Sequence, residues 1–206
     1  MTAPALPVAA PRLLHEPGLS GFLFADPRLA PVWALLRIYV GYEWLMAGWG
    51  KVTNPAGVWV GDKAGAAVSG FLTGALAKTD GAHPDVQGWY AWFLQHVALP
   101  NAAAFSYVVA YGEVLVGIAL ILGLFTGIAA FFGGVMNASY LLAGTVSTNP
   151  LLFILATWLV LGWRVAGWWG LDRWMLARFG VTPRVNGVTS TVPGPLRGGS
   201  PDPQAH

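Results

Sequence analysis

One long stretch that is nearly free of charge constrains this chain most. Residues 79–163 contain no lysine or arginine, and Glu113 is the only ionisable carboxylate within residues 103–144. An apolar run of this length is typical of two membrane spans joined by a tight turn, here at residues 123–127. Because a charge inside the bilayer is energetically expensive, an intramembrane carboxylate usually marks a functional site. We therefore expect the function of the protein to depend on what Glu113 contacts.

The composition agrees with a membrane protein and excludes several other classes. Of the 206 residues, 55% are hydrophobic and only 10% are charged, whereas soluble domains carry about 25% charged residues. The 11 basic residues are scattered and the net charge is +2, so nucleic acid is not an expected partner. The chain has no cysteine, which excludes disulfides, thiol redox chemistry and cysteine-held metal or haem.

The hydrophobic runs and turn signals predict an all-α membrane protein, a bundle of four transmembrane helices. The predicted spans cover about residues 31–50, 102–123, 127–144 and 150–169, each close to the roughly 20 residues that cross a bilayer. A long helical extracytoplasmic loop at residues 52–100 separates the first two spans. The membrane domain thus covers residues 26–180, and we expect disordered tails at 1–25 and 181–206, where Pro, Gly, Ser and Thr are frequent.

Within the 52–100 loop, the apolar spacing predicts two short amphipathic helices. Asp62 is the expected N-cap of the first helix, which would bury Val68 and Leu72. Pro84 and Asp85 would begin the second helix, on which Val86, Trp89, Phe93 and Val97 are aligned. Trp59, Trp89, Tyr90 and Trp92 suit a membrane–water interface.

The distribution of basic residues predicts the orientation in the plasma membrane. The side that carries both termini is flanked by Arg12, Arg28, Arg173, Arg178 and Arg184. On the opposite side, the lysines of the loop are balanced by its aspartates. The positive-inside rule therefore places both termini in the cytoplasm, and we expect the first span to act as an uncleaved signal anchor.

Helical rise places several polar residues at similar depths in the bundle. Glu43 on the first span lies roughly 18 Å from the cytoplasmic side, and Glu113 and Asn137 on the next two spans lie roughly 16 Å from it. Arg37 lies about two turns below Glu43. Four-helix bundles build sites from facing side chains of this kind, and we expect Arg37 to reach Glu113 or a bound ligand.

Structural roles offer an alternative explanation of these polar residues. An Arg–Glu–Asn cluster can lock the register of the helices without any further function. Lys51 and Arg164 lie near span ends, where long side chains reach the headgroups. His83 and His96 lack the spacing of metal ligands, so no metal site is predicted.

Several segments resemble the DoxX/DoxD family of membrane proteins. The first span, LLRIYVGYEWLMAGWGK, and the second, YGEVLVGIALILGLFTGIAA, are similar to the opening helix and the Glu-bearing helix of that family. The loop KTDGAHPDVQGWYAWFLQHVALPN and the later LLAGTVSTNPLLF resemble the DoxD branch, the large membrane subunit of thiosulfate:quinone oxidoreductase. The resemblance extends over about residues 27–180.

This resemblance implies electron transfer to quinone beside a second, smaller membrane or soluble oxidoreductase subunit. Arg37 and Glu113 match the intramembrane Arg and Glu of the family. We expect Glu113 or Glu43 to relay protons and Arg37 or Asn137 to donate hydrogen bonds to the quinone. The candidate catalytic residues are thus Glu113, Arg37 and Glu43, and the candidate quinone-binding residues are Arg37, Asn137, Tyr111 and Trp44.

Two other functions fit the same sequence. The chain is alternatively a non-catalytic membrane anchor or scaffold that recruits redox or detoxification proteins. It is also compatible with a small-solute or proton pathway that uses the same Arg/Glu core.

Overall fold

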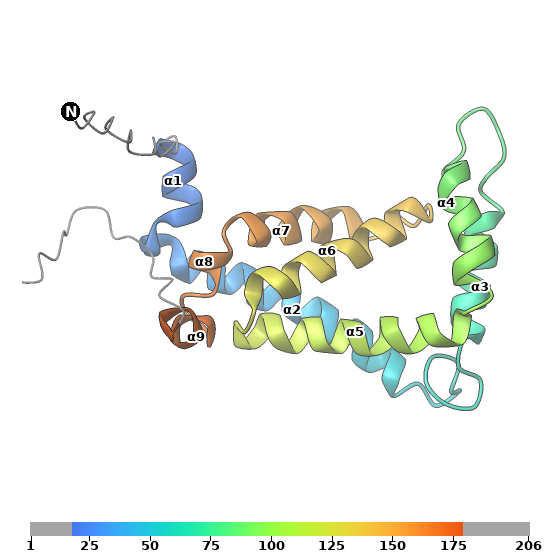
Figure 1. Cartoon of the computed structure of the whole chain (residues 1–206), viewed down its shortest axis with the longest axis horizontal. Helices are drawn as coiled ribbons and strands as arrows, with labels where there is room; N and C mark the ends of the chain where they lie inside the picture. Colours follow the sequence, from blue (N-terminus) through green and yellow to red (C-terminus); the bar gives the residue numbers. More distant parts are fainter. Residues whose placement is uncertain (1–17, 179–206) are drawn as a thin grey trace, which may run out of the picture.

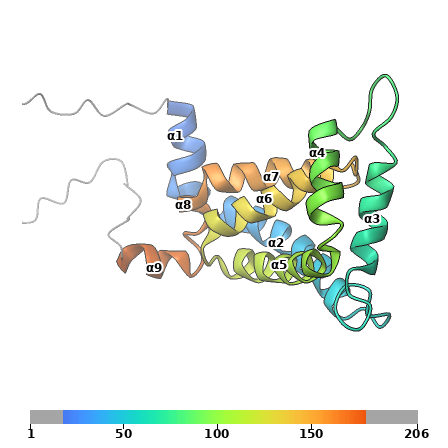
Figure 2. The same ribbon diagram turned by 45° about the vertical axis from the view of Figure 1, so that its right-hand side comes forward.

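The computed structural model describes residues 18–178, and every regular element within that range is a helix. Four long helices lie side by side as a bundle (Figure 1): α2 (Ala30–Val52), α5 (Ala102–Leu122), α6 (Thr126–Leu142) and α7 (Asn149–Leu161). Across one end of the bundle lie α3 (Ala66–Leu76) and α4 (Gly88–Phe93), and a π-helical turn (Leu94–Ala98) continues α4 (Figure 2). At the other end lie α1 (Gly18–Ala25), a 3-10 turn (Pro27–Leu29), α8 (Trp163–Ala166) and α9 (Asp172–Arg178).

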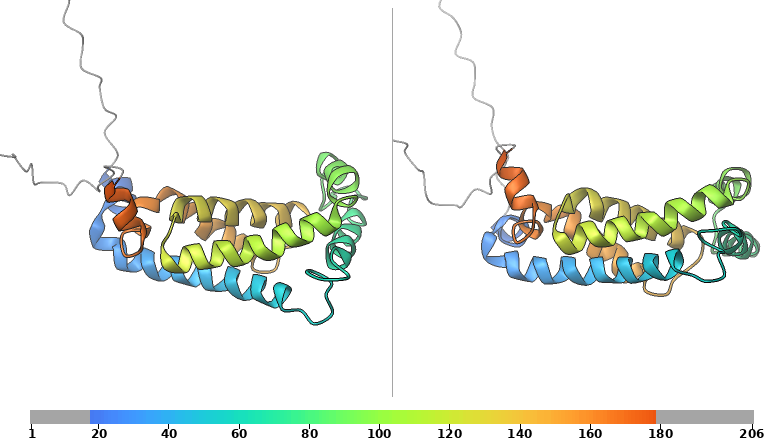
Figure 3. Two further views of the ribbon diagram at one scale, coloured as in Figure 1. Left: turned by 60° about the horizontal axis from the view of Figure 1, so that its bottom comes forward. Right: turned by 90° about the horizontal axis from the view of Figure 1, so that it is seen from below.

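Glycines bring α2 and α5 into backbone contact along their length (Figure 3). A Cβ atom added to Gly117 of α5 would lie 2.5 Å from the backbone nitrogen of Leu45, and one added to Gly48 of α2 would lie 2.6 Å from that of Val114. Neither position can accept a side chain. Small residues at such interfaces allow membrane helices to approach closely, so the glycines fix how α2 and α5 pack.

The hydrophobic core of the bundle forms between these helices and the α6–α7 pair. Its buried members include Ala30, Val40, Trp44, Leu120, Ala130, Leu159 and Val165. Gly133 of α6 packs against the Trp44 indole, and Gly134 faces Ala156 of α7. The buried face of α6 is therefore narrow and leaves room for the large Trp44 ring between the helices.

Helix lengths differ from the predicted spans at the C-terminal end. Among the described residues, α5 is the one helix whose length and apolar composition are both sufficient to cross a bilayer. The predicted fourth span extends to 169, but α7 ends at Leu161. A side chain at Gly162 would collide with the Trp33 ring, 3.0 Å away, and the chain turns there into α8.

The end layer differs in detail from the two predicted loop helices. Helix α3 begins after Gly65, whose φ of 96° favours glycine, so the predicted Asp62 cap is wrong. Helix α4 begins at Gly88 and buries Tyr90, while Trp89 is 64% exposed. The aligned row of Trp89, Phe93 and Val97 is therefore not the buried one, because Tyr90, Leu94 and Ala98 pack inward and the Tyr90 hydroxyl is bonded to the Ser139 carbonyl.

Part of the predicted N-terminal tail is helical. Helix α1 (Gly18–Ala25) is joined to α2 by a hydrogen bond from Trp33 Nε1 to the Leu23 carbonyl, 2.8 Å long, and by contact of the Phe24 and Trp33 rings. The rest of the predicted tails, 1–17 and 181–206, lies outside the described residues.

Candidate functional site

Arg37 does not contact Glu113. Its buried guanidinium donates hydrogen bonds to four backbone carbonyls, those of Leu120, Ile121 (3.0 Å), Ala166 (3.0 Å) and Trp169 (3.5 Å). Leu120 is seven residues beyond Glu113, about 10 Å along α5. The predicted contact between Arg37 and Glu113 is therefore wrong, because Arg37 is too far toward the other end of the bundle.

The position of Arg37 explains what it stabilises. The last carbonyls of a helix have no partner within the helix, and a cation there also interacts favourably with the helix dipole. At the end of α5, Arg37 supplies both a hydrogen-bond donor for these carbonyls and a positive charge. On the facing side of the turn, Asp172 accepts hydrogen bonds from the backbone nitrogens of Phe125 (2.6 Å) and Thr126 (2.8 Å), where α6 begins.

Together these contacts hold the α5–α6 turn against the segment before α9. The backbone nitrogen of Asp172 donates to the Gly123 carbonyl at 2.7 Å. Gly123 has a φ of 64°, and a Cβ atom there would lie 2.7 Å from the Arg37 guanidinium and 2.8 Å from the Gly170 Cα. Arg37 and Asp172 are thus built into the backbone framework of this end.

Glu113 is instead paired with two residues that the sequence did not single out for this role. Its carboxylate lies 2.5 Å from the Lys51 ammonium and accepts a hydrogen bond of 2.8 Å from the Tyr140 hydroxyl. The Glu113 side chain is 1% exposed, while that of Lys51 is 20% exposed. Lys51 therefore does not simply extend to the headgroups, because it pairs with the acid.

Local packing brings these three side chains together from three helices. Gly48, nearly one turn before Lys51 on α2, lies against the Cβ atom of Glu113. Tyr140, on α6, is held from the end layer by the edge-on ring of Phe71, with centroids 6.1 Å apart. The neighbouring Ser139 carbonyl accepts a hydrogen bond from Tyr90 at 2.9 Å.

Two polar side chains on the helices that carry the Lys51–Glu113–Tyr140 cluster are buried without a hydrogen-bond partner. Among the described residues, neither the amide oxygen nor the amide nitrogen of Asn137 has a hydrogen bond, and neither has Trp44 Nε1. Asn137 is nearly one turn before Tyr140 and one turn after Gly133, which the Trp44 indole touches. A buried polar group without a partner costs about 1–3 kcal/mol, so this position favours occupation by a polar atom of a ligand or water.

A family model described as DoxX matches residues 32–145. The chain belongs to the DoxX family. The match extends from α2 through α6 and includes Lys51, Glu113, Asn137 and Tyr140. No curated protein and no solved structure matches the chain. The family and the apolar helix α5 identify it as a membrane protein.

Two of the predicted site residues of this DoxX-family protein lie away from the Glu113 cluster. Glu43 is half-buried, and among residues 18–178 it has no hydrogen bond or ion pair. It precedes the buried Trp44 by one residue and so points about 100° away from it. Tyr111 is 46% exposed and stacks on Tyr107, because it lies about 200° round α5 from Glu113.

Lys51 and Tyr140 are the members of the cluster that sequence reasoning missed. A lysine that closes the span carrying Arg37 and Glu43, and a tyrosine nearly one turn after Asn137, were the available signals. Both were ambiguous, because lysine and tyrosine are common at membrane interfaces.

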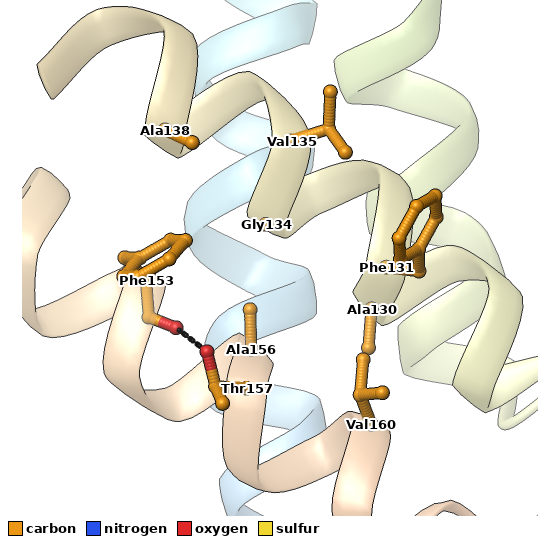
Figure 4. A pocket seen from close by; sticks show the side chains of 9 residues that line it. All are labelled: Ala130, Phe131, Gly134, Val135, Ala138, Phe153, Ala156, Thr157 and Val160. Atoms are coloured by element: carbon orange, nitrogen blue, oxygen red, sulfur yellow. Dashed lines mark hydrogen bonds between the residues drawn. The ribbon is translucent and has the colours of Figure 1, made fainter. Parts of the chain in front are cut away.

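An apolar groove lies on the outer side of the α6–α7 pair (Figure 4). It has a volume of about 210 Å³ and is lined by side chains such as Phe131, Val135 and Phe153. The Thr157 hydroxyl at its wall already donates to the Phe153 carbonyl at 2.8 Å. The groove therefore offers apolar contact only, in contrast to the polar interior at Asn137.

Proposed function

We propose that this DoxX-family protein is the membrane subunit of a quinone-linked oxidoreductase, of the thiosulfate:quinone type. The observation that carries this proposal is the pairing of two kinds of group in the bundle interior. The bundle interior holds a buried acid with hydrogen-bonding neighbours, Glu113, and buried polar groups without partners among the described residues, those of Asn137 and Trp44. The first suits proton transfer and the second suits recognition of a polar ligand.

In this proposal the four long helices cross the membrane, α7 together with α8. Helices α2 and α5, with 23 and 21 residues, are about 35 and 32 Å long, whereas α6 and α7 are shorter and require local thinning of the bilayer. The basic side chains of Arg28, Arg164 and Arg173 lie toward the end that carries α1 and α9, which supports a cytoplasmic position for both termini. The segment with α3 and α4 then lies outside.

The interior residues fit a quinone head group. Such a group supplies two-electron, two-proton redox chemistry when it is bound. The Asn137 amide and Trp44 Nε1 provide donors that a carbonyl oxygen requires, and the Asn137 oxygen provides an acceptor for a hydroxyl. The Trp44 ring adds an apolar wall at the same position.

Lys51, Glu113 and Tyr140 are suited to hold and move a proton. The Tyr140 hydroxyl donates to one carboxylate oxygen and Lys51 to the other, so Glu113 is poised between a proton donor and a cation. A carboxylate in such a chain accepts or delivers a proton with little rearrangement. Arg37, whose donors are directed to backbone carbonyls, has a structural role in this scheme.

A scaffold function is the alternative, and the position of Glu43 favours it. A half-buried carboxylate without a partner in the described chain, on the flank of α2 about 100° from Trp44, suggests a face that another membrane subunit covers. This alternative requires no turnover.

The test is an assay of the protein, purified together with any membrane or soluble subunit that binds it, in nanodiscs with thiosulfate and a short-chain quinone analogue. We expect quinone-dependent turnover that is abolished in Glu113→Gln and retained in Asp80→Asn, a matched change at an exposed acid of the end layer. No turnover, with a stably co-purified partner, would support the scaffold. Proton flux into liposomes without a redox couple would support a transport pathway.

A further inference from the structure

The hydrogen-bonded cluster of Lys51, Glu113 and Tyr140 is partly exposed to solvent at Lys51. Glu113 is 1% exposed, whereas the Lys51 side chain is 20% exposed and lies where α2 ends. Lys51 is followed by the 53–65 segment, which leads to α3. Of the side chains that contact Glu113, Lys51 thus links the buried carboxylate to the surface at the end of α2.

Trp59 lies against this exposed end of the chain. The Lys51 ammonium is 5.1 Å from the centre of the Trp59 ring, within the range of a cation–π interaction. The ring therefore both attracts the ammonium and takes up space that water would otherwise occupy. Lys51 is held between the Glu113 carboxylate and the Trp59 ring.

The 53–65 segment is fixed to α5 in a way that keeps Trp59 in place. The Ser106 hydroxyl, fully buried, donates to the Trp59 carbonyl at 2.6 Å. Further along, the Tyr107 hydroxyl accepts from the backbone nitrogen of Gly61 at 3.4 Å. Gly65 then packs so tightly against the backbone of Ala103 that a Cβ atom would lie 2.7 Å from its nitrogen.

We propose that Trp59 is a lid that controls access of water and protons to the Lys51–Glu113 pair from the α3–α4 end of the bundle. The titratable side chains that contact Glu113 are Lys51 from α2 and Tyr140 from α6, and Lys51 is the one next to the lid. The inference rests on the proposed proton-transfer role of Glu113. It adds that protons reach Glu113 from the α3–α4 end of the bundle, past Lys51, and that Trp59 limits this access.

Lysine labelling tests the lid without any assay of turnover. Protein in nanodiscs is treated with a water-soluble amine-reactive reagent, and labelling of Lys51 is measured by mass spectrometry relative to the exposed Lys63. Removal of the ring in Trp59→Ala is expected to raise relative Lys51 labelling about tenfold, and Trp59→Phe, which keeps an aromatic face, by no more than about threefold. Trp89→Ala, a matched change at an exposed tryptophan of the end layer, should leave it unchanged.

The same variants are then compared for proton exchange at Glu113. Infrared difference spectra after an acid jump follow the carboxyl band that is absent in Glu113→Gln. We expect faster protonation in Trp59→Ala than in wild type or Trp89→Ala. Unchanged labelling, or unchanged protonation, in Trp59→Ala would overturn the lid. If the wild-type Glu113 band does not respond to acid at all, the proton role in the proposed function fails, and the labelling result still decides whether Trp59 covers Lys51.

Discussion

The Lys51 ammonium lies 2.5 Å from the Glu113 carboxylate, although the two residues are 62 positions apart in the chain. A buried ion pair is favourable only when its remaining hydrogen-bonding atoms are satisfied, and the Tyr140 hydroxyl meets that need on the second carboxylate oxygen. The two cations of α2 are therefore divided between two tasks. Lys51 pairs with the acid, and Arg37 binds the backbone at the opposite end.

Replacement of Arg37 should destabilise the fold. In Arg37→Met the carbonyls of Ile121 and Ala166 lose their buried donor and that of Leu120 loses one of two, and we expect the free energy of unfolding in detergent micelles to fall by about 3 kcal/mol. Arg164→Gln is the matched control, because Arg164 is exposed and lies over the Trp163 ring. Equal stability of the two variants would show that Arg37 has no such structural role.

The sequence was sufficient to identify Arg37 as unusual but not to find its partners. Depth estimates from helical rise placed Arg37 below Glu113 correctly, yet they could not show that backbone carbonyls would satisfy it. Those carbonyls become available only where α5 ends and the 162–172 segment folds back on Gly123. Contacts of this kind depend on tertiary packing, which no residue pattern in the sequence records.

Replacement of Asn137 should stabilise the ligand-free protein. Because both amide atoms are buried without partners, we expect Asn137→Leu to raise the free energy of unfolding by about 1–2 kcal/mol. Ser106→Ala provides the contrast, since Ser106 is equally buried but its hydroxyl is paired with Trp59. The free energy of unfolding of Ser106→Ala should be about 1 kcal/mol lower than that of wild type. A loss of stability in Asn137→Leu would mean that the amide is satisfied in the free protein.

The α2–α5 contact should not tolerate a single added methyl group. Gly117→Ala would place a Cβ atom 2.5 Å from the Leu45 nitrogen, whereas Gly112→Ala on the same helix meets only the flexible Met136 sulfur, at 3.7 Å. We expect Gly117→Ala to lower the thermal midpoint markedly, by the equivalent of about 3 kcal/mol or more. Gly112→Ala should be neutral or slightly stabilising. Similar midpoints for both variants would contradict the close packing.

Helix positions were more predictable than helix faces. Apolar runs and Gly or Pro punctuation placed α5 and α6 within two residues of their ends. In the end layer, however, the alignment of Trp89, Phe93 and Val97 did not reveal which face of α4 is buried. The tertiary hydrogen bond of Tyr90 to Ser139 and the π-helical turn after Phe93 rotate the buried face, and neither is visible in apolar spacing.

Docking of α4 should weaken at alkaline pH through Tyr90. Burial raises the pKa of the Tyr90 phenol, although its hydrogen bond to Ser139 acts in the opposite direction. The unfolded state therefore loses this proton first, so the contribution to stability is present below a pH of about 10 and is lost above it. The difference in unfolding free energy between wild type and Tyr90→Phe should shrink as the pH rises through that value. A constant difference would contradict the buried, protonated phenol.

Binding of a quinone analogue to the purified protein tests the central claim, that the interior between Glu113 and Asn137 is a ligand site. The experiment is an equilibrium binding measurement with a short-chain quinone in nanodiscs. It compares wild type with Glu113→Gln, Asn137→Leu and the control Asp80→Asn. The proposed site predicts saturable binding to wild type and Asp80→Asn, weakened at least about tenfold in Asn137→Leu, which lacks the donor and acceptor. No binding to wild type, or equal affinity in Asn137→Leu, would contradict the account.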